Sequence, residues 1–225
     1  MTKVIYVGGG KGGVGKSLVS MAAVDWQVSV GRRVLLVEGD GANPDVYKCY
    51  ERLIPVRTCD FDVEDGWNDL GDLAESGEAE VIVVNSGARV IEGVRRYGHV
   101  MEDCARAGVM DLAVLWPINR LRDSISALKD FRAVVRTGQV GVIRNLFFGP
   151  QEKFTRWERS TYAQDLLKSG ARVADLDELS DRLIDKIYDD RMPIAEIARS
   201  GGIVDRSNIG HWRKSSHASL AAVVQ

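Results

Sequence analysis

Cysteine and long hydrophobic runs are scarce in this sequence, and each shortage excludes a class of protein. The three cysteines, Cys49, Cys59 and Cys104, include no C-x-x-C pair, which argues against a structural zinc site or a disulfide framework. No window approaches the ~18 consecutive apolar residues of a membrane-spanning helix. Residues 3–7 form a strand-like segment where a secretory leader would stand. These features predict a cytoplasmic protein with reduced thiols.

A surplus of either charge is also missing. Lys and Arg total 30 against 32 Asp and Glu, and the net charge of -2 gives no global reason to expect nucleic acid or an anionic membrane as a partner. Hydrophobic residues make up 45% of the 225 residues, which is enough for one globular domain with a sizeable core. No repeat, low-complexity tract or linker rich in proline, glycine or serine divides the chain. We therefore predict one domain over residues 1–225.

What the sequence does contain is a regular alternation of short apolar runs and longer amphipathic stretches. Runs that are apolar at every position are typical of strands buried on both faces of a parallel sheet. Five such runs occur, at 4–7, 34–37, 81–84, 112–115 and 140–143. Stretches of helical period lie at 17–30, 91–107 and 121–135. The alternation predicts an α/β fold with a predominantly parallel sheet and helices on both faces.

Two parts of the chain are less regular. Residues 53–56 could form a short strand, and Pro55 favours an edge position for it. Later in the chain the pattern becomes mainly helical, with a final strand possible at 172–176. The predicted helices there cover 162–168, 179–188, 194–200 and 207–224. We therefore predict a core at 1–150 followed by a helical C-terminal section at 151–225.

A glycine-rich segment after the first predicted strand satisfies two motifs. Residues 10–15 match G-x-G-x-x-G, the dinucleotide fingerprint, and Glu38 lies near the place of its ribose-binding acid. Residues 10–17 also match the more demanding pattern G-x-x-x-x-G-K-[ST] in full. A hydride-transfer enzyme has no need for Lys16 and Ser17 at this turn, whereas a phosphate-binding loop does. We therefore interpret the segment as a nucleotide-phosphate loop rather than a chance glycine turn.

Each part of this loop has a separate physical task. Glycines allow successive backbone N–H groups to point at phosphate oxygens, and the following helix adds the positive end of its dipole. Lys16 would bridge the β- and γ-phosphates, and the hydroxyl of Ser17 would ligate Mg²⁺. The predicted nucleotide-binding residues of the loop are Gly10, Lys11, Gly12, Gly13, Val14, Gly15, Lys16, Ser17 and Leu18.

Lys11 gives the loop a second lysine, and with it the run resembles the deviant Walker A motif, K-G-G-x-G-K-[ST], of the ParA/MinD family of P-loop ATPases. The resemblance extends over roughly residues 1–150 and implies ATP and Mg²⁺ as cofactors and an ATP-dependent homodimer. In that family the lysine at the position of Lys11 reaches the phosphates of the partner subunit. A second cation there would stabilise charge as an arginine finger does. A solvated loop lysine is the alternative.

The resemblance continues at the end of the second apolar run, where residues 37–45 resemble the D-x-D switch segment. Asp40 takes the position of the acid that orients the attacking water and the Mg²⁺ shell, and Glu38 stands where the first Asp usually does. The carboxyl ends of strands beside a phosphate loop are where open α/β sheets place their ligands. Turn chemistry between Gly39 and Gly41 is the alternative explanation of Asp40.

One position departs from the family pattern. Residues 80–88 resemble the Walker B region, but Asn85 replaces its usual Asp. Asn can accept a hydrogen bond from a Mg²⁺-bound water but offers no charge to the metal. We therefore expect weaker Mg²⁺ binding and slow hydrolysis. The predicted catalytic residues are Lys11, Lys16 and Asp40, and the predicted metal ligands are Ser17 and Asp40.

Asn145 ends the fifth apolar segment, where the family has an adenine-binding Asn, and we predict that it contacts the base. A turn residue at a strand end is an equally good explanation. The sequence also resembles TraL-type ATPases of conjugative-transfer operons. The shared features are a Walker B region ending in a polar–Gly–Ala step and a fifth strand that ends in Asn and is followed by the aromatic–Gly step at 147–149. A basic C-terminal helix is the last shared feature.

A cluster of cations lies in the last part of the chain. Its members are Arg206, His211, Arg213, Lys214 and His217, with Trp212 among them. Such a cluster could contact DNA phosphates nonspecifically. The alternative, which we favour, is a solvated helix face that docks Leu220, Val223 and Val224 on the domain. A membrane-binding helix is disfavoured because the strong apolar moment and flanking lysines it requires are missing.

Three functions remain open. The first is a slowly hydrolysing Mg-ATPase that acts as a nucleotide-dependent dimer switch with a partner protein in plasmid partition or conjugative transfer. The second is a nucleotide-sensing regulatory module with negligible catalysis, which Asn85 suggests. The third, a P-loop synthetase or kinase acting on a small metabolite, has no second set of substrate-binding residues to support it.

Overall fold

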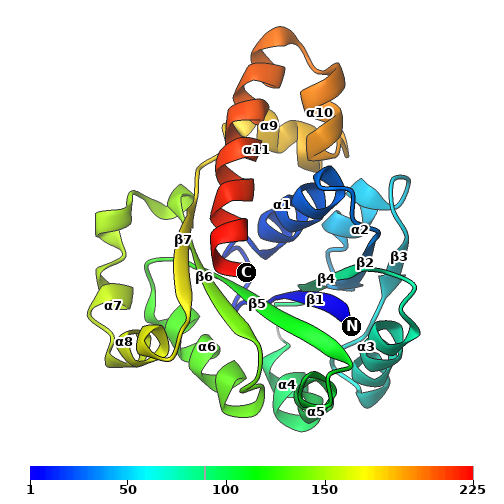
Figure 1. Cartoon of the computed structure of the whole chain (residues 1–225). Helices are drawn as coiled ribbons and strands as arrows, with labels where there is room; N and C mark the ends of the chain where they lie inside the picture. Colours follow the sequence, from blue (N-terminus) through cyan, green and yellow to red (C-terminus); the bar gives the residue numbers. More distant parts are fainter. Residues whose placement is uncertain (89, 225) are drawn as a thin grey trace.

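A seven-stranded sheet forms the centre of the computed structural model, which describes residues 1–88 and 90–224 (Figure 1). Neighbouring strands pair in parallel, and their order across the sheet is β3-β2-β4-β1-β5-β6-β7. The strands are β1 (Thr2–Val7), β2 (Val34–Gly39), β3 (Val56–Thr58), β4 (Val81–Ser86), β5 (Met110–Ile118), β6 (Gln139–Asn145) and β7 (Arg172–Leu176). β1 lies in the middle of the sheet, and helices cover both of its faces, as its apolar run at 4–7 requires.

The alternation of side chains along β1 divides the interior into two cores. Val4 and Tyr6 belong to one core and Ile5 and Val7 to the other, and all four are fully buried. Successive residues of a strand face opposite sides, so a strand that is apolar at every position supplies both cores.

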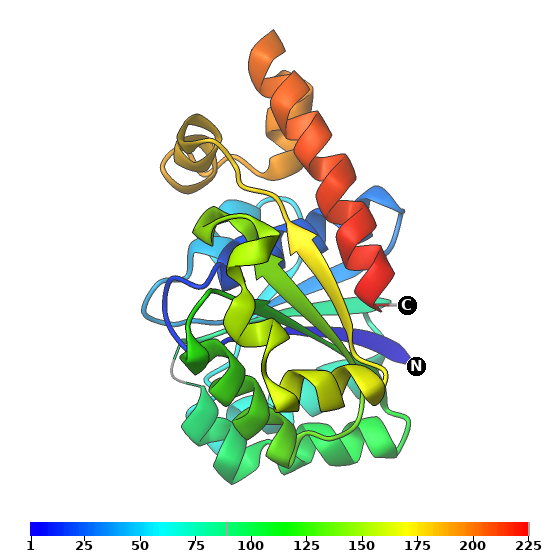
Figure 2. The same ribbon diagram turned by 90° about the vertical axis from the view of Figure 1, so that its left-hand side faces the viewer.

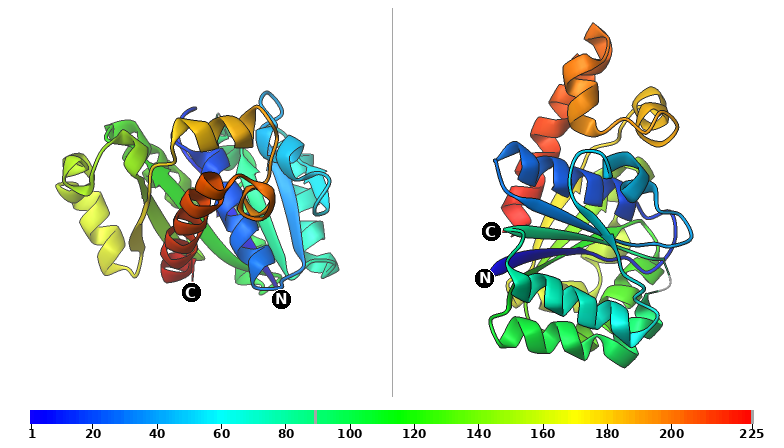
Figure 3. Two further views of the ribbon diagram at one scale, coloured as in Figure 1. Left: turned by 90° about the horizontal axis from the view of Figure 1, so that it is seen from above. Right: turned by 90° about the vertical axis from the view of Figure 1, so that its right-hand side faces the viewer.

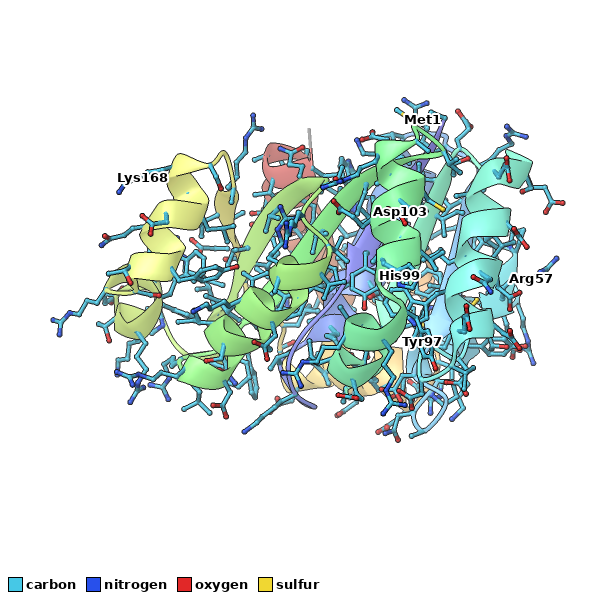
Figure 4. All side chains as sticks on the ribbon, turned by 90° about the horizontal axis from the view of Figure 1, so that it is seen from below. Met1, Arg57, Tyr97, His99, Asp103 and Lys168 are labelled. Atoms are coloured by element: carbon cyan, nitrogen blue, oxygen red, sulfur yellow. The ribbon has the colours of Figure 1, made fainter. Side chains whose placement is uncertain are left out.

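The core of Val4 and Tyr6 lies beneath a row of helices that Figure 4 views from outside, with Tyr97 and His99 marking the junction of α4 and α5. These helices are α3 (Glu64–Ser76), α4 (Ile91–Tyr97), α5 (His99–Arg106), α6 (Arg122–Val134), α7 (Thr155–Glu158) and α8 (Thr161–Lys168). The ring of Phe131 on α6 stacks on Tyr6 with centroids 5.2 Å apart. Helix α6 is therefore fixed beside the strand that leads into the glycine-rich loop.

The opposite face is covered by α1, by α2 and by helices from the last part of the chain (Figure 3). They are α1 (Lys16–Ser29), α2 (Asp45–Tyr50), α9 (Asp181–Tyr188), α10 (Ile194–Ser200) and α11 (Ile203–Val224). Figure 2 shows α11 running from the sheet to a point well beyond it, where it meets α10. Asp25 on α1 accepts hydrogen bonds from Arg213 at 2.8 and 3.1 Å and lies 2.7 Å from Nε2 of His217.

The predicted α/β class, parallel sheet and helical C-terminal section are confirmed, but several elements differ from the prediction. The single helix expected at 91–107 is wrong, because α4 and α5 meet at Gly98. A Cβ there would lie 2.5 Å from the carbonyl oxygen of Val94, so glycine allows the chain to tighten at this point. The short strand expected at 53–56 is β3, which begins at Val56, directly after Pro55. It is at the edge of the sheet, beside β2, as predicted.

Helix α3 is absent from the prediction because glycines interrupt its apolar pattern. One of them, Gly66, is required by packing, since a Cβ there would lie 2.1 Å from the carbonyl oxygen of Asp60. Two short 3-10 helices, η1 (Leu146–Phe148) and η2 (Gln151–Lys153), follow β6. Among the described residues, no helix combines the length and the apolar content that a membrane crossing needs.

Candidate nucleotide-binding site

The glycine-rich loop occupies residues 8–15, between the end of β1 and the start of α1. β1 has β4 on one side and β5 on the other, and the chain passes from β1 first to one half of the sheet and later to the other. Open parallel sheets bind ligands at such a switch point, outside the carboxyl ends of the strands. The loop therefore lies where this fold offers a ligand-binding crevice.

The backbone of the loop requires glycine at Gly13 and Gly15, which have φ values of 77° and 99°. Around Gly12 and Gly13 no atom lies within 4 Å of a hypothetical Cβ, so the loop is open to solvent there. At Gly15 a Cβ would lie 2.4 Å from Nδ2 of Asn145. The loop is thus open on its outer side and tightly supported from beneath, which suits a cradle for phosphate oxygens.

The two lysines of the loop have different environments. Lys16 is only 6% exposed, and its ammonium donates a hydrogen bond to the carbonyl oxygen of Lys11 at 3.2 Å. Burial lowers the pKa of Lys16, and the nearby carboxylate of Asp40 partly opposes this effect. Lys11 is exposed, and its ammonium pairs with the carboxylate of Asp123 in the first turn of α6. Lys16 is therefore directed along the loop, while Lys11 extends away from it.

The remaining loop residues contribute in different ways. Ser17 is partly exposed in the first turn of α1, where its hydroxyl can reach a ligand. Val14 and Leu18 are buried in the core, so only their backbone groups are available to a ligand. Gly10 packs against α6, since a Cβ there would lie 2.2 Å from Cβ of Ala127.

Asp40 lies in the loop after β2 and forms part of the wall of a cleft of about 970 Å³. Its Oδ1 accepts a hydrogen bond from the amide of Asn43 at 3.0 Å. The effect of Asp40 on the pKa of Lys16 indicates that its charge acts on the phosphate loop. The other cleft residues include Glu38, Asp60, Asp62, Gly87 and Ala88, from the carboxyl ends of neighbouring strands.

Oxygen donors from Ser17 and Asp40 are of the kind that Mg²⁺ prefers, and Mg²⁺ usually takes only one or two protein ligands and keeps several waters. Within 1–88 and 90–224 there is no cluster of three or more His, Cys, Asp or Glu that could enclose a metal ion. The donor set thus suits Mg²⁺ held together with a phosphate ligand rather than a metal held by protein alone.

At the wall of this cleft, Glu38 on β2 forms a buried pair with Asn85 on β4. Nδ2 of Asn85 donates to Oε1 of Glu38 at 2.7 Å, and the hydroxyl of Ser20 on α1 donates to Oδ1 of Asn85 at 3.0 Å. Glu38 also accepts hydrogen bonds from the amides of Asp40 and Tyr47. Burial raises the pKa of Glu38, and these three N–H donors oppose the rise. The group links β2, β4 and α1 directly beneath the loop.

Asn145, predicted to contact adenine, lies instead against the underside of the loop. Its Nδ2 donates to the carbonyl oxygen of Val14 at 3.1 Å, and its Oδ1 accepts from the amide of Phe147 at 3.2 Å. Both ends of the amide are therefore engaged within the chain, which agrees with the alternative of a turn residue. A contact between Asn145 and a base stays a prediction.

The C-terminal cations do not form one free surface. Arg213 and His217 face Asp25, and Trp212 is buried with its indole N–H donating to the carbonyl oxygen of Asp177 at 2.8 Å. The predicted docking residues Leu220, Val223 and Val224 are all buried. A different basic surface lies between α6 and the α7–α8 segment, in a groove of about 670 Å³. Its cations are Arg122, Lys129, Arg156 and Arg159, and no carboxylate lines it.

Sequence reasoning missed three contributors to the site: Ser20, Asp123 and the direct bond between Glu38 and Asn85. Ser20 follows Lys16 by four residues and so lies on the face of α1 that is directed at the sheet. Asp123 is an acid in the first turn of a helix, a position that also has a simple dipole explanation. Glu38 and Asn85 are direct neighbours because β2 pairs with β4 in this register, and the bond between them could not be predicted without the strand order.

Comparisons with known proteins agree with this geometry. No family model matches the chain. It is 36% identical to Protein MobD of Acidithiobacillus ferrooxidans over 225 residues, covering all of this chain and 99% of that protein. A candidate plasmid partition protein of Borrelia burgdorferi bound to AMPPNP shares the fold, with a TM-score of 0.62, 15% identity and 99% of each chain covered. MinD of Pyrococcus horikoshii complexed with Mg-ADP has a TM-score of 0.56 and 18% identity, with 100% of this chain and 99% of that one covered. The predicted ParA/MinD resemblance is confirmed at the level of the fold.

Proposed function

The chain belongs to the family of Protein MobD and has the fold of ParA/MinD-type ATPases, and on that premise we propose that it is a Mg-ATP-binding dimer switch with slow hydrolysis. The observation that carries the proposal is the loop at 8–15, with its glycines in left-handed conformations, its open outer side and its buried lysine. Nucleotides bound to two proteins of the same fold support ATP as the ligand.

The loop residues bind the phosphates in this proposal. Backbone N–H groups around Gly12 and Gly13 face the phosphate oxygens, and the N-terminus of α1 adds its positive dipole end. Lys16 releases the carbonyl oxygen of Lys11 and turns its ammonium to the β- and γ-phosphates. Ser17 and Asp40 would hold Mg²⁺, which would supply positive charge to the phosphate oxygens. Asp40 would also orient the water molecule that attacks the γ-phosphate.

In this proposal Lys11 contacts the nucleotide of the second subunit. It is exposed and its present partner, Asp123, is also exposed, so the ammonium can exchange that carboxylate for a phosphate of the partner subunit. Dimerisation would then depend on ATP, because the triphosphate supplies the negative charge between the two subunits. A partner protein of a plasmid partition or transfer system in the cytoplasm would bind the dimer and not the monomer. The plasmid partition protein of Borrelia burgdorferi, which has the same fold, supports a role connected with plasmids.

Slow turnover is proposed because the Walker B position carries the neutral Asn85. If turnover is negligible, the same site makes a nucleotide-sensing regulatory module, which is the alternative function. The two differ in phosphate release per dimer, which a single-turnover measurement with Mg-ATP determines.

The decisive experiment measures the mass of the protein by analytical ultracentrifugation with and without a non-hydrolysable ATP analogue. We expect dimers only with the analogue. Lys16→Ala should weaken analogue binding by about 10- to 100-fold, because a hydrogen bond to a charged group is worth about 1.5–3 kcal/mol, and should abolish dimers. Lys214→Ala, which removes an exposed lysine of α11, is the matched control. Identical sedimentation with and without the analogue would contradict the proposal.

Nonspecific DNA binding is a second candidate activity, and the groove between α6 and α7–α8 favours it. In the C-terminal cluster, Arg213 and His217 are paired with Asp25 and so are not available to DNA. The groove presents four cations and several hydroxyl groups, and no carboxylate lines it. Cations on a concave surface suit a phosphodiester backbone. No aromatic ring except that of Tyr162 lines the groove, which favours a duplex over stacked single strands.

Fluorescence anisotropy with a labelled DNA duplex, at several salt concentrations and with the ATP analogue present, tests this candidate. Lys129→Glu combined with Arg156→Glu should weaken binding and reduce the salt slope by about 1 for each lost phosphate contact. The control is the double variant Arg206→Glu/Lys214→Glu, which makes the same change of charge on α11. An equal loss in both double variants would show that the groove has no special role.

A further inference from the structure

The outermost strand of the sheet, β3, has a neighbouring strand on one side only (Figure 1). The carbonyl oxygen of Pro55 and the amide of Cys59 each form a hydrogen bond of 3.1 Å to β2. In a parallel sheet, alternate residues of a strand direct their backbone groups to opposite sides. The N–H and C=O groups of Val56 and Thr58 therefore point away from β2, along the free edge.

This edge has one guard. Nη1 of Arg57, which Figure 4 shows at the outer rim of the molecule, donates to the carbonyl oxygen of Val56 at 3.2 Å. In the parts of the chain that the structure describes, no other group bonds to the outward-facing backbone of Val56 and Thr58. Short strands, prolines and charges are the usual means of keeping an edge from pairing with another chain. Because Pro55 and Arg57 are of this kind, the surroundings of β3 must decide whether the edge is a docking site.

A cleft lies on each face of this edge strand. The cleft beside α3 has a volume of about 410 Å³, and its carboxylates are Asp69, Asp72 and Glu78. The cleft beside the end of α1 has a volume of about 450 Å³ and is mainly apolar. Its apolar residues are Val28, Val34, Leu35, Ile54, Pro55 and Ala79. Arg57 and Glu78 line both clefts, so the two clefts meet at β3.

The two clefts differ in free charge. In the apolar cleft, Arg32 and Arg33 are both paired with Glu80. In the cleft beside α3, neither Arg57 nor any of the three carboxylates forms an ion pair within 1–88 and 90–224. Three carboxylates against one guanidinium leave this cleft negative. The edge strand thus has an apolar cleft on one face and an acidic cleft on the other.

We propose that β3 accepts an extended segment of a partner protein as an eighth strand, in which apolar side chains alternate with lysine or arginine. Successive side chains of a strand point to opposite faces, so the apolar ones enter the cleft beside α1 and the basic ones face Asp69 and Asp72. The backbone of the segment bonds to Val56 and Thr58. A second copy of this chain fits less well, because antiparallel pairing of β3 with itself places Arg57 opposite its own copy, and like charges there are destabilising.

The probe for this proposal is a fluorescein-labelled peptide in which valine and lysine alternate. Fluorescence anisotropy at low salt, without nucleotide, measures its affinity for the whole chain. Thr58→Pro removes an outward-facing N–H but no bond to β2, and proline is tolerated on edge strands, so the fold should survive. We expect this variant to bind the peptide about tenfold more weakly, because a backbone hydrogen bond is lost. Thr58→Val keeps the N–H and should stay within about twofold of wild type.

Two charge variants should change the affinity in opposite directions. Asp69→Lys combined with Asp72→Lys should weaken binding by about 5- to 30-fold, because two exposed ion pairs are lost. Arg57→Ala should strengthen it by up to about fivefold, because it frees the carbonyl oxygen of Val56 and removes a positive charge. A poorly folded protein cannot bind more tightly, so this variant keeps the test valid if Thr58→Pro is unstable. A peptide in which valine and glutamate alternate is the matched control.

Binding that is weakened in Thr58→Pro, kept in Thr58→Val and increased in Arg57→Ala supports the proposal. Failure of wild type to bind the valine–lysine peptide overturns it, as does equal binding of the valine–glutamate peptide. A dimer that forms without nucleotide and is abolished by Thr58→Pro would assign the edge to a second copy, which also overturns it. The phosphate loop has no part in this docking, so its failure would leave the proposed function intact.

Discussion

The ammonium of Lys11 contacts the carboxylate of Asp123, which ties the phosphate loop to the first turn of α6. The two side chains are 62% and 53% exposed, so their pairing stabilises this arrangement by at most about 1 kcal/mol. Such a contact orders the loop without preventing Lys11 from moving to another anion.

Replacing Asp123 by Asn should therefore strengthen ATP-dependent dimers, by no more than about 30-fold, because the carboxylate competes with phosphate for Lys11 in each of the two subunits. Lys11→Ala should abolish the dimer. Sedimentation velocity with AMPPNP measures both. Asp130→Asn is the control, because Asp130 also lies on α6 and pairs with Arg95 of α4. A weaker dimer in Asp123→Asn would mean that the acid positions Lys11 for its role instead of competing for it.

Gly15→Ala should destabilise the protein by about 1–3 kcal/mol, because φ of 99° is strained for alanine and its Cβ would lie 2.4 Å from Nδ2 of Asn145. Gly31→Ala separates the two causes, since Gly31 has φ of 79° but no atom within 4 Å of a hypothetical Cβ. Urea denaturation should show the larger loss at Gly15. Equal losses would show that the contact with Asn145 has no energetic effect.

Asp25→Ala should cost about 1.5–3 kcal/mol of unfolding free energy, because it removes the carboxylate that accepts the hydrogen bonds of Arg213 at the interface of α1 and α11. The side chain of Asp25 is only 1% exposed. Asp165→Ala, which breaks the exposed pair with Lys168 at the end of α8, should cost less than about 1 kcal/mol. Similar losses in the two variants, measured by chemical denaturation, would argue against a structural role for the buried pair.

Glu102 predicts a specific acid sensitivity. Burial would raise its pKa, but four hydrogen bonds, from the backbone and hydroxyl of Thr137, from the amide of Arg136 and from Arg106, outweigh this and hold the pKa below its ordinary value of 4.5. The unfolded chain then binds the proton more readily. The stabilisation is complete above pH 4.5 and is lost as the pH falls through the lower, folded-state pKa.

Thermal unfolding of Glu102→Gln, followed from neutral pH to below pH 4, should therefore show a weaker dependence on pH than wild type. Asp103→Asn, an exposed neighbour on α5 that Figure 4 labels, should follow the wild-type curve. A Glu102→Gln profile parallel to that of wild type would contradict the assignment.

The fold class and the position of the glycine-rich loop could be predicted from the sequence because both depend on local patterns. Uniformly apolar runs identify buried parallel strands, and the loop motif places Lys16 and Ser17 at the start of a helix, as observed. Helix α3 was not predictable in this way, since its glycines are explained only by contacts such as that of Gly66 with Asp60.

The rest of the candidate site depends on contacts between distant residues. Glu38 and Asn85 are 47 residues apart, and Lys11 and Asp123 are 112 apart. Nothing in the local sequence around Asn85 indicates that a neighbouring strand provides a carboxylate. The bond between Glu38 and Asn85 follows from the register of β2 and β4, which the local sequence does not indicate.

Asn145 holds the carbonyl oxygen of Val14 across a separation of 131 residues. This long-range bond has a consequence during protein synthesis. The loop that begins at residue 8 leaves the ribosome early, but its support arrives only with the end of the sixth strand. Nascent chains that stop short of Asn145 should carry the complete motif and yet fail to bind ATP. Nucleotide binding would thereby mark a chain that has been synthesised at least to the end of β6.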